Sequence, residues 1–339
     1  MIKALLCEQP GSFRYIDKEK PLLESSHAIL KIKRIGICGT DLHAFEGTQP
    51  FFNYPRILGH ELAAEIVAIE PGNEFAVGDR VTFSPYFYCG KCIACRNGLT
   101  NCCADIKVFG VHIDGGMCEY ISVPLQYLIK GNDMSFDELA LVEPLAIGAH
   151  GIRRAGVKSG EYVLVIGAGP IGLGVMEFAR IAGAHVIAMD VNEQRLKFCR
   201  DKLNVTHTIN PTKDDVIEQL RSITNNDMPT VVIDATGNLK AINTAFQYLA
   251  HGGRFVLVGL QREALTVSHP EFHKREATLM SSRNATTEDF NHVLASMKNK
   301  LLDPATYITH RVLFDEVKDN FESWLNPATG VIKAMVSLD

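Results

Sequence analysis

The sequence lacks an excess of basic residues. Its 34 Lys and Arg are outnumbered by 39 Asp and Glu, which gives a formal net charge of -5 at pH 7. Proteins that bind nucleic acids usually carry a basic surplus on one face. We therefore expect no nucleic-acid partner.

The sequence also lacks a long hydrophobic run. Its most apolar stretch, residues 162–176, is shorter than the ~20 residues of a membrane-spanning helix and is broken by glycines and a proline. The first residues, MIKALLCEQPGSFRY, show no charged segment followed by an apolar run and a cleavage site, as a secretory signal would. We expect a cytoplasmic protein with no membrane partner.

The order of apolar and turn-forming residues changes near residue 160. Before it, short β-branched runs such as HAILKIKRIG and AAEIVAIE predict a β-rich domain. After it, strand-like and helix-like segments alternate, which predicts a parallel sheet with helices on both faces. The alternation stops after about residue 281, and we expect the tail to return to the first domain. The sequence thus predicts an α/β protein with domains of residues 1–147 plus 285–339 and residues 148–284.

A glycine-rich turn opens the second domain. Gly167, Gly169 and Gly172 follow the apolar strand YVLVI and precede a helix, the context of a dinucleotide-binding Rossmann turn. The next strand ends at Asp190, whose carboxylate would bind a ribose hydroxyl and repel a 2′-phosphate, which favours NAD over NADP. The alternative is a turn without a ligand, with Asp190 capping the following helix.

Further residues are candidates for contact with the cofactor. Gly259 and the segment from Asp234 to Gly237 stand at the ends of later strands, where ligands bind in such sheets, although plain turns explain them as well. The full set of expected cofactor-binding residues is Gly167, Gly169, Pro170, Ile171, Gly172, Asp190, Arg195, Gly259 and Arg283.

Four of the nine cysteines are closely spaced. Cys89, Cys92, Cys95 and Cys103 have the spacing of a closed tetrahedral zinc site, which would hold a loop and take no part in catalysis. Cys102 competes with Cys103 as the fourth ligand. In a reducing compartment a disulfide framework is not expected. The sequence therefore predicts a structural zinc lobe at about residues 86–105.

A second, scattered set of residues could form a catalytic zinc site. Cys38, His60, Glu61 and Glu143 supply one thiolate, one imidazole and two carboxylates, and a catalytic zinc needs about three such ligands and an open position. Spacing alone does not bring them together. Each residue also has an ordinary structural explanation, as a buried cysteine, a hydrogen-bonded histidine or a glutamate in an ion pair.

Five motifs occur in the order GICGTDLH, GHE, CGKC with IAC, VEPLA and GAGPIG. Together they resemble the zinc-containing medium-chain dehydrogenases over essentially the whole chain, and VEPLA resembles their polyol dehydrogenase branch. The resemblance implies a GroES-like catalytic domain, a Rossmann domain and an active cleft between them. It also implies Cys38, His60 and Glu61 as zinc ligands, with Glu143 as a fourth, exchangeable one.

The same resemblance implies a mechanism. Zinc would bind the substrate hydroxyl, a hydride would pass to the nicotinamide of NAD, and Thr40 and His43 would pass the proton to solvent. His43 suits this role because the pKa of histidine lies near neutral. A surface histidine at the turn into a helix is the alternative.

Two stretches resemble bacterial sugar-acid dehydrogenases that oxidise L-galactonate or L-gulonate at C5, namely GTQPFFNYPRILGHE and PEFHKREATLMSSRNATTEDF. Arg283 could pair with the substrate carboxylate or contact the cofactor. Lys274 and Arg275 have an ion pair with Glu276 as their ordinary explanation. Ala44 stands where sorbitol dehydrogenases carry an aromatic residue, which leaves room for a different or longer substrate.

Three alternatives stay open beside a sugar-acid dehydrogenase. They are a polyol dehydrogenase for sorbitol or galactitol, an L-threonine dehydrogenase, and a zinc-stabilised regulatory protein without catalysis. The VEPLA motif disfavours the second, and the complete ligand set disfavours the third. We expect two zinc ions per chain, NAD, a small-molecule substrate and a homo-oligomer, either a dimer or a tetramer.

Overall fold

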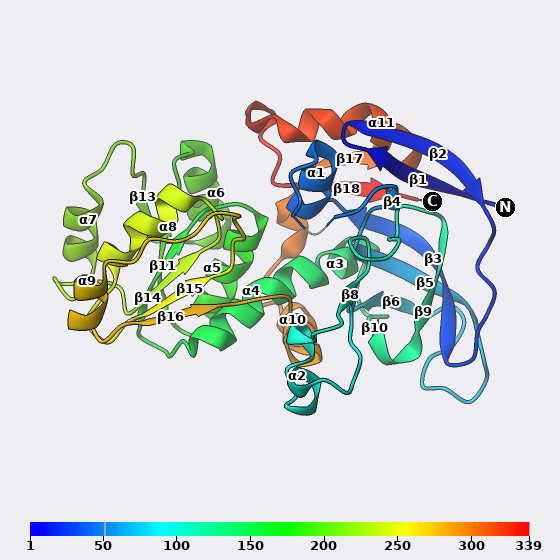
Figure 1. Cartoon of the computed structure of the whole chain (residues 1–339), viewed down its shortest axis with the longest axis horizontal. Helices are drawn as coiled ribbons and strands as arrows, with labels where there is room; N and C mark the ends of the chain where they lie inside the picture. Colours follow the sequence, from blue (N-terminus) through cyan, green and yellow to red (C-terminus); the bar gives the residue numbers. More distant parts are fainter. Residues whose placement is uncertain (51, 339) are drawn as a thin grey trace. The chain divides into compact units, whose positions relative to one another are not determined.

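The computed structural model describes residues 1–50 and 52–338. The chain divides into one unit of Met1–Pro144 with Thr286–Asp339 and a second of Leu145–Ala285 (Figure 1). The tail thus joins the N-terminal segment, and the boundaries differ from the expected ones by three residues (144 against 147) and one residue (285 against 284). Phe51 and Asp339, which belong to the expected first domain, lie outside the described residues.

The second unit is built on a parallel sheet. Within residues 145–285 its six strands have the order β13-β12-β11-β14-β15-β16. Their bounds are β11 (Tyr162–Ile166), β12 (His185–Met189), β13 (His207–Ile209), β14 (Val231–Asp234), β15 (Arg254–Leu257) and β16 (Thr278–Ser281). Every neighbouring pair in this sheet is parallel.

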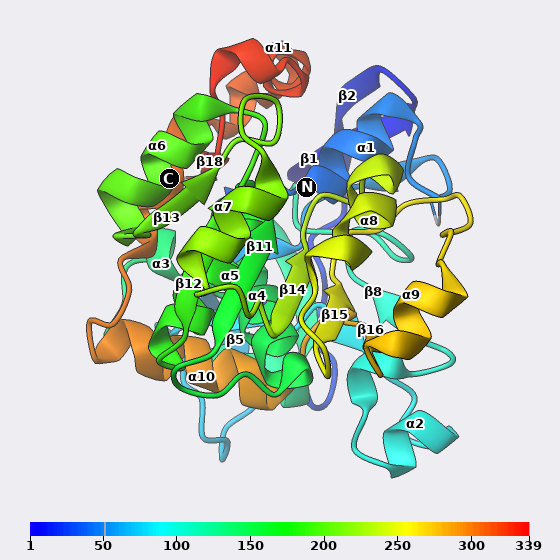
Figure 2. The same ribbon diagram turned by 90° about the vertical axis from the view of Figure 1, so that its left-hand side faces the viewer.

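Helices alternate with these strands, and most of the helices pack against the sheet (Figure 2). They are α4 (Val142–Ala155), α5 (Pro170–Ile181), α6 (Glu193–Leu203), α7 (Val216–Ile223), α8 (Leu239–Ala245) and α9 (His269–Lys274). Strands buried on both faces read as continuous apolar runs, as YVLVI of β11 does. The predicted doubly wound α/β fold is confirmed.

The first unit is mainly β-structure. Its strands are β1 (Ile2–Gln9), β2 (Ser12–Lys18), β3 (His27–Gly36), β4 (Arg56–Ile57), β5 (Glu61–Ile69), β6 (Arg80–Phe83), β7 (Tyr86–Phe87), β8 (Lys107–Val108), β9 (Tyr120–Pro124), β10 (Leu128–Lys130), β17 (Ile308–Leu313) and β18 (Lys333–Ser337). The central strand β3 pairs with β5, β9 and β18, so the tail completes the sheet of the N-terminal segment. A buried cluster that includes Phe13, Phe45 and Phe321 forms part of its core.

The helices of the first unit are α1 (Gly39–Glu46), α2 (Ile93–Arg96), α3 (Phe136–Ala140), α10 (Thr287–Lys298) and α11 (Val317–Asn320). Helix α1 follows β3 directly, and β5 begins at Glu61, next to His60. Because β3 and β5 pair with Gly36 opposite Glu61, the segments that carry Cys38 and His60 lie side by side.

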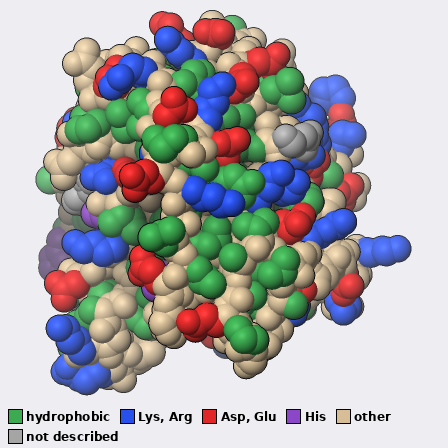
Figure 3. Space-filling model, turned by 90° about the vertical axis from the view of Figure 1, so that its right-hand side faces the viewer, with side chains coloured by type: hydrophobic (Ala, Val, Ile, Leu, Met, Phe, Trp, Pro, Cys, Tyr) green, Lys and Arg blue, Asp and Glu red, His purple; other side chains and the backbone are tan. Residues whose placement is uncertain are grey.

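The surface and the helix lengths bear on possible partners. Among residues 1–50 and 52–338, we find no helix with both the length and the apolar character needed to cross a bilayer. Figure 3 shows basic and acidic side chains interspersed over the face that it presents.

Candidate active site

Two of the three glycines in the turn after β11, Gly167 and Gly172, are required for steric reasons. Gly167 has φ +101°, a conformation that favours glycine. A Cβ atom on Gly172 would lie 1.8 Å from the carbonyl oxygen of Gly167, so the helix approaches the turn too closely for a larger residue. Gly169 is the N-cap of α5, and Pro170 begins that helix. The first turn of α5 therefore offers unpaired backbone N–H groups to an anion at this turn.

Asp190 follows β12 and ties it to the glycine-rich turn. Its Oδ2 atom accepts a hydrogen bond from the backbone N–H of Ala168 at 2.7 Å, and its Oδ1 atom accepts one from Asn192 at 2.8 Å. Asn192, and not Asp190, is the N-cap of α6. The capping explanation of Asp190 is therefore wrong, and its carboxylate belongs to the glycine-rich turn.

Two other expected cofactor residues lie around the ends of the strands. The Nη1 atom of Arg195 would be 3.9 Å from a Cβ atom built on Gly169, so its guanidinium lies beside the turn. A Cβ atom on Gly259 would lie 2.2 Å from the backbone nitrogen of Gly237, so the loops after β14 and β15 meet there. Asp234 secures this meeting point by accepting a hydrogen bond from Gly237 N–H at 3.0 Å.

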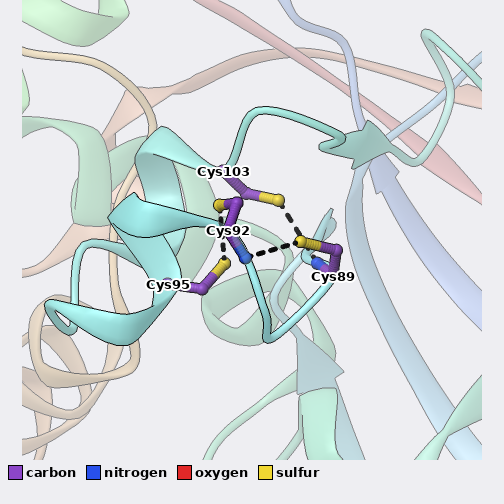
Figure 4. Close-up of side chains that lie close together, drawn as sticks. All are labelled: Cys89, Cys92, Cys95 and Cys103. Atoms are coloured by element: carbon purple, nitrogen blue, oxygen red, sulfur yellow. Dashed lines mark hydrogen bonds between the residues drawn. The ribbon is translucent and has the colours of Figure 1, made fainter.

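The four closely spaced cysteines converge in the first unit (Figure 4). Their sulfur atoms all lie within 4.8 Å of one another, as one tetrahedral ion would require. Backbone hydrogen bonds from Ala104 and Cys95 lower the pKa of Cys92 to about 6, whereas burial raises the pKa of Cys95 to about 12, so without a metal the four thiols do not ionise alike. Cys103 belongs to this group and is buried, whereas the neighbouring Cys102 is exposed and lies outside it. The donor set fits a closed zinc site.

A second group of donor atoms comes from Cys38, His60 and Glu61, whose ligand atoms also lie within 4.8 Å of one another. Cys38 is the N-cap of α1, and its backbone N–H donates to Asp41 Oδ2 at 2.9 Å. A thiolate, an imidazole and a carboxylate are ligands that zinc accepts, so the residues present fit this metal.

The surroundings of His60 favour a bound cation. Burial alone would lower the pKa of His60, but the negative charges of Asp41 and Cys38 outweigh it and raise this pKa well above its usual value. The Nδ1 atom of His60 is buried, has no hydrogen-bond partner among the residues that the structure describes, and lies 3.7 Å from Asp41 Oδ1. A metal-ligating histidine commonly directs its second ring nitrogen at a carboxylate, and Asp41 occupies that place.

Glu61 also has a cationic partner, Lys333 of β18. Both carboxylate oxygens of Glu61 lie 2.6 Å from Lys333 Nζ, and neither side chain is more than 2% exposed. Burial acts to lower the pKa of Lys333, but the negative charge of Glu61 outweighs it, and this pKa is raised. The buried ammonium group of Lys333 therefore contacts Glu61, which is one of the expected metal ligands.

Glu143 lies in the first turn of α4 and outside the three-residue group among the described residues. Its Oε1 atom accepts a hydrogen bond from the Tyr86 hydroxyl. Burial and the charge of Glu61 raise the pKa of Glu143 to about 7, although His60 and the Tyr86 hydrogen bond act in the opposite direction. Glu143 thus has a neutral partner of its own and is close enough to the group to feel its charges.

Of the remaining expected residues, His43 and Arg283 are exposed and Thr40 is half-buried. Thr40 and His43 lie on α1 with Cys38 at its start, and His43 Nδ1 is 3.3 Å from both Glu46 Oε2 and Thr48 Oγ1. Arg283 is exposed and follows β16 in the second unit.

The ion pair suggested for Lys274 and Arg275 is formed with a different residue. Both side chains pair with Glu271, at 2.9 Å and 2.7 Å, one helical turn before them on α9. The suggested pairing with Glu276 is therefore wrong. Glu276 comes after the end of α9 and has a positive φ of 47°, whereas residues three and four apart on a helix share one face.

Sequence reasoning missed Lys333, Tyr86 and the role of Asp41. One signal for Lys333 was available, because a lysine inside the apolar strand VIKAMVSL is costly to bury without a partner. Nothing in the sequence identifies that partner as Glu61, which lies 272 positions earlier. Tyr86 and Glu143 are likewise 57 positions apart.

Two family models match the chain. The alcohol dehydrogenase GroES-like domain matches residues 24–133, and the zinc-binding dehydrogenase domain matches residues 170–299. The chain is 41% identical to the L-galactonate-5-dehydrogenase of Escherichia coli K12 over 99% of both chains. It is 30% identical to the sorbitol dehydrogenase of Bacillus subtilis over 93% of this chain and 91% of that one. An alcohol dehydrogenase from E. coli CFT073, solved with NADH, is 30% identical with a TM-score of 0.93, and 99% of each chain is covered.

Proposed function

Since the chain belongs to the zinc-dependent medium-chain dehydrogenases, in their polyol dehydrogenase branch, we propose that it oxidises a secondary alcohol of a sugar acid with NAD. The substrate in this proposal is L-galactonate or L-gulonate, and the product is the 5-keto acid. The observation that carries it is the 41% identity, over 99% of both chains, to an enzyme named L-galactonate-5-dehydrogenase.

In this proposal Cys38, His60 and one carboxylate, Glu61 or Glu143, hold the catalytic zinc. A bound zinc ion supplies a Lewis acid that polarises the substrate oxygen. Asp41 orients His60 from behind, at the distance described above. Thr40 and His43 then carry the hydroxyl proton toward solvent, which suits the exposure of His43 on α1.

The second unit binds NAD in this proposal. The pyrophosphate lies at the start of α5, where the glycines leave room and the backbone N–H groups are unpaired. The Asp190 carboxylate keeps lone pairs for a ribose hydroxyl, and Arg195 lies beside the same turn. The solved relative in complex with NADH supports this cofactor.

The direct test is to monitor NAD reduction with a panel of aldonates, polyols and L-threonine. We expect L-galactonate or L-gulonate to give the highest kcat/KM. A neutral polyol oxidised faster than every aldonate would replace the proposal by a polyol dehydrogenase, for which the sorbitol dehydrogenase relative is the support. No turnover with any alcohol, in protein with both zinc sites filled, would favour a zinc-stabilised regulatory protein.

Arg283 is the proposed partner of the substrate carboxylate, since a guanidinium binds carboxylates in a bidentate manner. In the Arg283→Ala variant, kcat/KM for an aldonate should fall much more than that for a neutral polyol, because only the charged substrate loses its partner. An equal loss for both substrates would place Arg283 on the cofactor.

The proposal includes a homo-oligomer, either a dimer or a tetramer. Its support is the edge strand β16, which pairs with β15 and is last in the strand order of its sheet within residues 145–285. Edge strands left open are sites of further strand pairing. Light scattering on the purified protein would give the number of chains.

A further inference from the structure

The buried ion pair of Lys333 and Glu61 lies within the expected metal site itself. Lys333 Nζ is 2.6 Å from both carboxylate oxygens of Glu61 and also donates to the carbonyl oxygen of Ile37 at 3.1 Å. The Glu61 carboxylate is also tightly packed, since a Cβ atom on Gly36 would lie 2.2 Å from its Oε2 atom. The side chain of Glu61 is therefore held in one place by a charge and by close packing.

The same carboxylate also faces the expected metal site of Cys38 and His60. A ligand atom of Glu61 lies within 4.8 Å of the donor atoms of Cys38 and His60. A carboxylate that already receives a charged hydrogen bond on both oxygens donates less electron density to a metal.

We propose that Lys333 is a positioning residue that competes with the metal for Glu61 and holds this carboxylate back from full ligation. The inference rests on the proposed function in one respect, namely that Cys38 and His60 hold a metal. By this inference Lys333, a buried lysine with no role in the proposed reaction, controls the affinity of the site for its metal. Glu143, whose partner Tyr86 is neutral, is the carboxylate that this competition leaves available.

The test measures metal affinity in the intact chain and does not depend on turnover. Zn²⁺ is titrated in competition with a chromophoric chelator into the wild type and into the Lys333→Met, Glu61→Gln and Glu61→Gln/Lys333→Met variants. A Cys38→Ser variant reports the binding of the four-cysteine lobe alone, so that the second site is obtained by difference. Lys31→Met is the matched control, because Lys31 is a partly exposed lysine of β3 in the same sheet.

We expect Lys333→Met to bind Zn²⁺ at the second site about tenfold more tightly than the wild type, the lower end of effects for groups that support metal ligands. Lys31→Met should bind as the wild type does. Most of the gain should vanish in the Glu61→Gln background, because the competition requires the carboxylate. A folded Lys333→Met variant with unchanged or weaker binding would overturn the inference, and so would a gain that persists undiminished without Glu61.

Lys333→Met leaves Glu61 buried without its partner and could fail to fold. The comparison of Glu61→Gln with the double variant then decides, since a tenfold difference between these two would show that Lys333 acts without the carboxylate and would overturn the inference. An affinity that is equal in both supports it. If the wild type and Cys38→Ser bind the same number of zinc ions, the proposed metal site itself is wrong, which is a different outcome from a failure of Lys333.

Discussion

In the proposed NAD site, one side chain, Asp190, would serve both the fold and the cofactor. Its two oxygens accept hydrogen bonds from Ala168 and Asn192, and a carboxylate has about four acceptor positions in all. Capacity therefore remains for a ribose hydroxyl. A 2′-phosphate at the same place would meet a like charge that is only 9% exposed.

We predict that Asp190→Asn shifts the cofactor preference toward NADP. The ratio of kcat/KM for NADP to that for NAD should rise by about tenfold or more, because the amide removes the charge and keeps one acceptor. Asp201→Asn is the matched control, since Asp201 lies on the outer face of α6 in an exposed pair with Lys197. Steady-state rates with both cofactors decide it, and an unchanged ratio would mean that Asp190 does not reach the ribose.

At the residue scale, some of the candidate site could be predicted and some could not. Cys89, Cys92 and Cys95 are close in sequence, so their spacing alone indicates that they bind one metal ion. The residues around Cys38 come together through the pairing of β3 with β5. Periodicity does not determine this pairing, so only the family resemblance predicts that these residues form one site. Lys333 has no motif, and its place beside Glu61 follows only from the pairing of β18 with β3.

At the element scale, one carboxylate of α3 pairs with two arginines of the neighbouring sheet. Asp137 in its first turn is 2.9 Å from Arg34 of β3 and 2.6 Å from Arg311 of β17. Burial acts to raise the pKa of Asp137, but the hydrogen bonds and charges of Arg311 and Arg34 outweigh it, and this pKa is lowered from 3.8. A carboxyl group whose pKa is lower in the folded state stabilises the fold above its unfolded pKa, and the effect is lost as the pH falls.

We predict that Asp137→Asn lowers the free energy of unfolding by about 1 kcal/mol at pH 7, a value reduced for the partial exposure of the pair. The difference from the wild type should shrink as the pH falls below about 4, because the wild-type carboxyl is then protonated as well. Urea unfolding between pH 7 and pH 3 measures it. Asp133→Asn, in a highly exposed pair with Lys298, should change little at any pH. A deficit that stays constant with pH would show that the charge of Asp137 is not its cause.

Helices α4 and α5 pack closely through glycine. A Cβ atom on Gly148 would lie 2.5 Å from the backbone of Gly174, whereas one on Gly151, one turn later on α4, would meet its nearest neighbour at 3.4 Å. We predict that Gly148→Ala lowers the free energy of unfolding by about 2–3 kcal/mol through overpacking. Gly151→Ala should be neutral or raise it by about 0.5–1 kcal/mol, because alanine favours a helix. Chemical denaturation compares the two, and equal effects would contradict the close packing of these helices.

The alternation of strands and helices in the second unit could be predicted, since apolar strands and the helices between them follow one another along the chain. The β-rich unit is harder, because its central sheet joins segments from both ends of the sequence, such as β3 and β18. The sequence indicates that a final strand exists in VIKAMVSL. It does not indicate which strand that segment joins, since many pairings bury the same apolar face.

At the scale of the whole molecule, the two groups of candidate metal ligands belong to the first unit and the glycine-rich turn belongs to the second. We predict that their functions can be separated by mutation. Cys38→Ser should abolish turnover, remove about one zinc ion per chain and leave the thermal midpoint and the affinity for NADH nearly unchanged, since it alters a site that keeps an open position. Elemental analysis, thermal unfolding and NADH fluorescence measure these effects.

Cys92→Ala should instead lower the thermal midpoint by at least about 5 °C, because a closed metal site supplies part of the folding free energy of its lobe. It should also remove about one zinc ion and spare NADH binding, whose proposed residues lie in the other unit. Cys102→Ser is the matched control, since Cys102 is exposed and outside the four-cysteine group, and it should keep both ions and the wild-type midpoint. A single zinc ion per wild-type chain after zinc-replete expression would contradict the division into two metal sites. Loss of NADH binding in Cys38→Ser would show that the units do not act separately, because the glycine-rich turn would then depend on the metal ligands of the other unit.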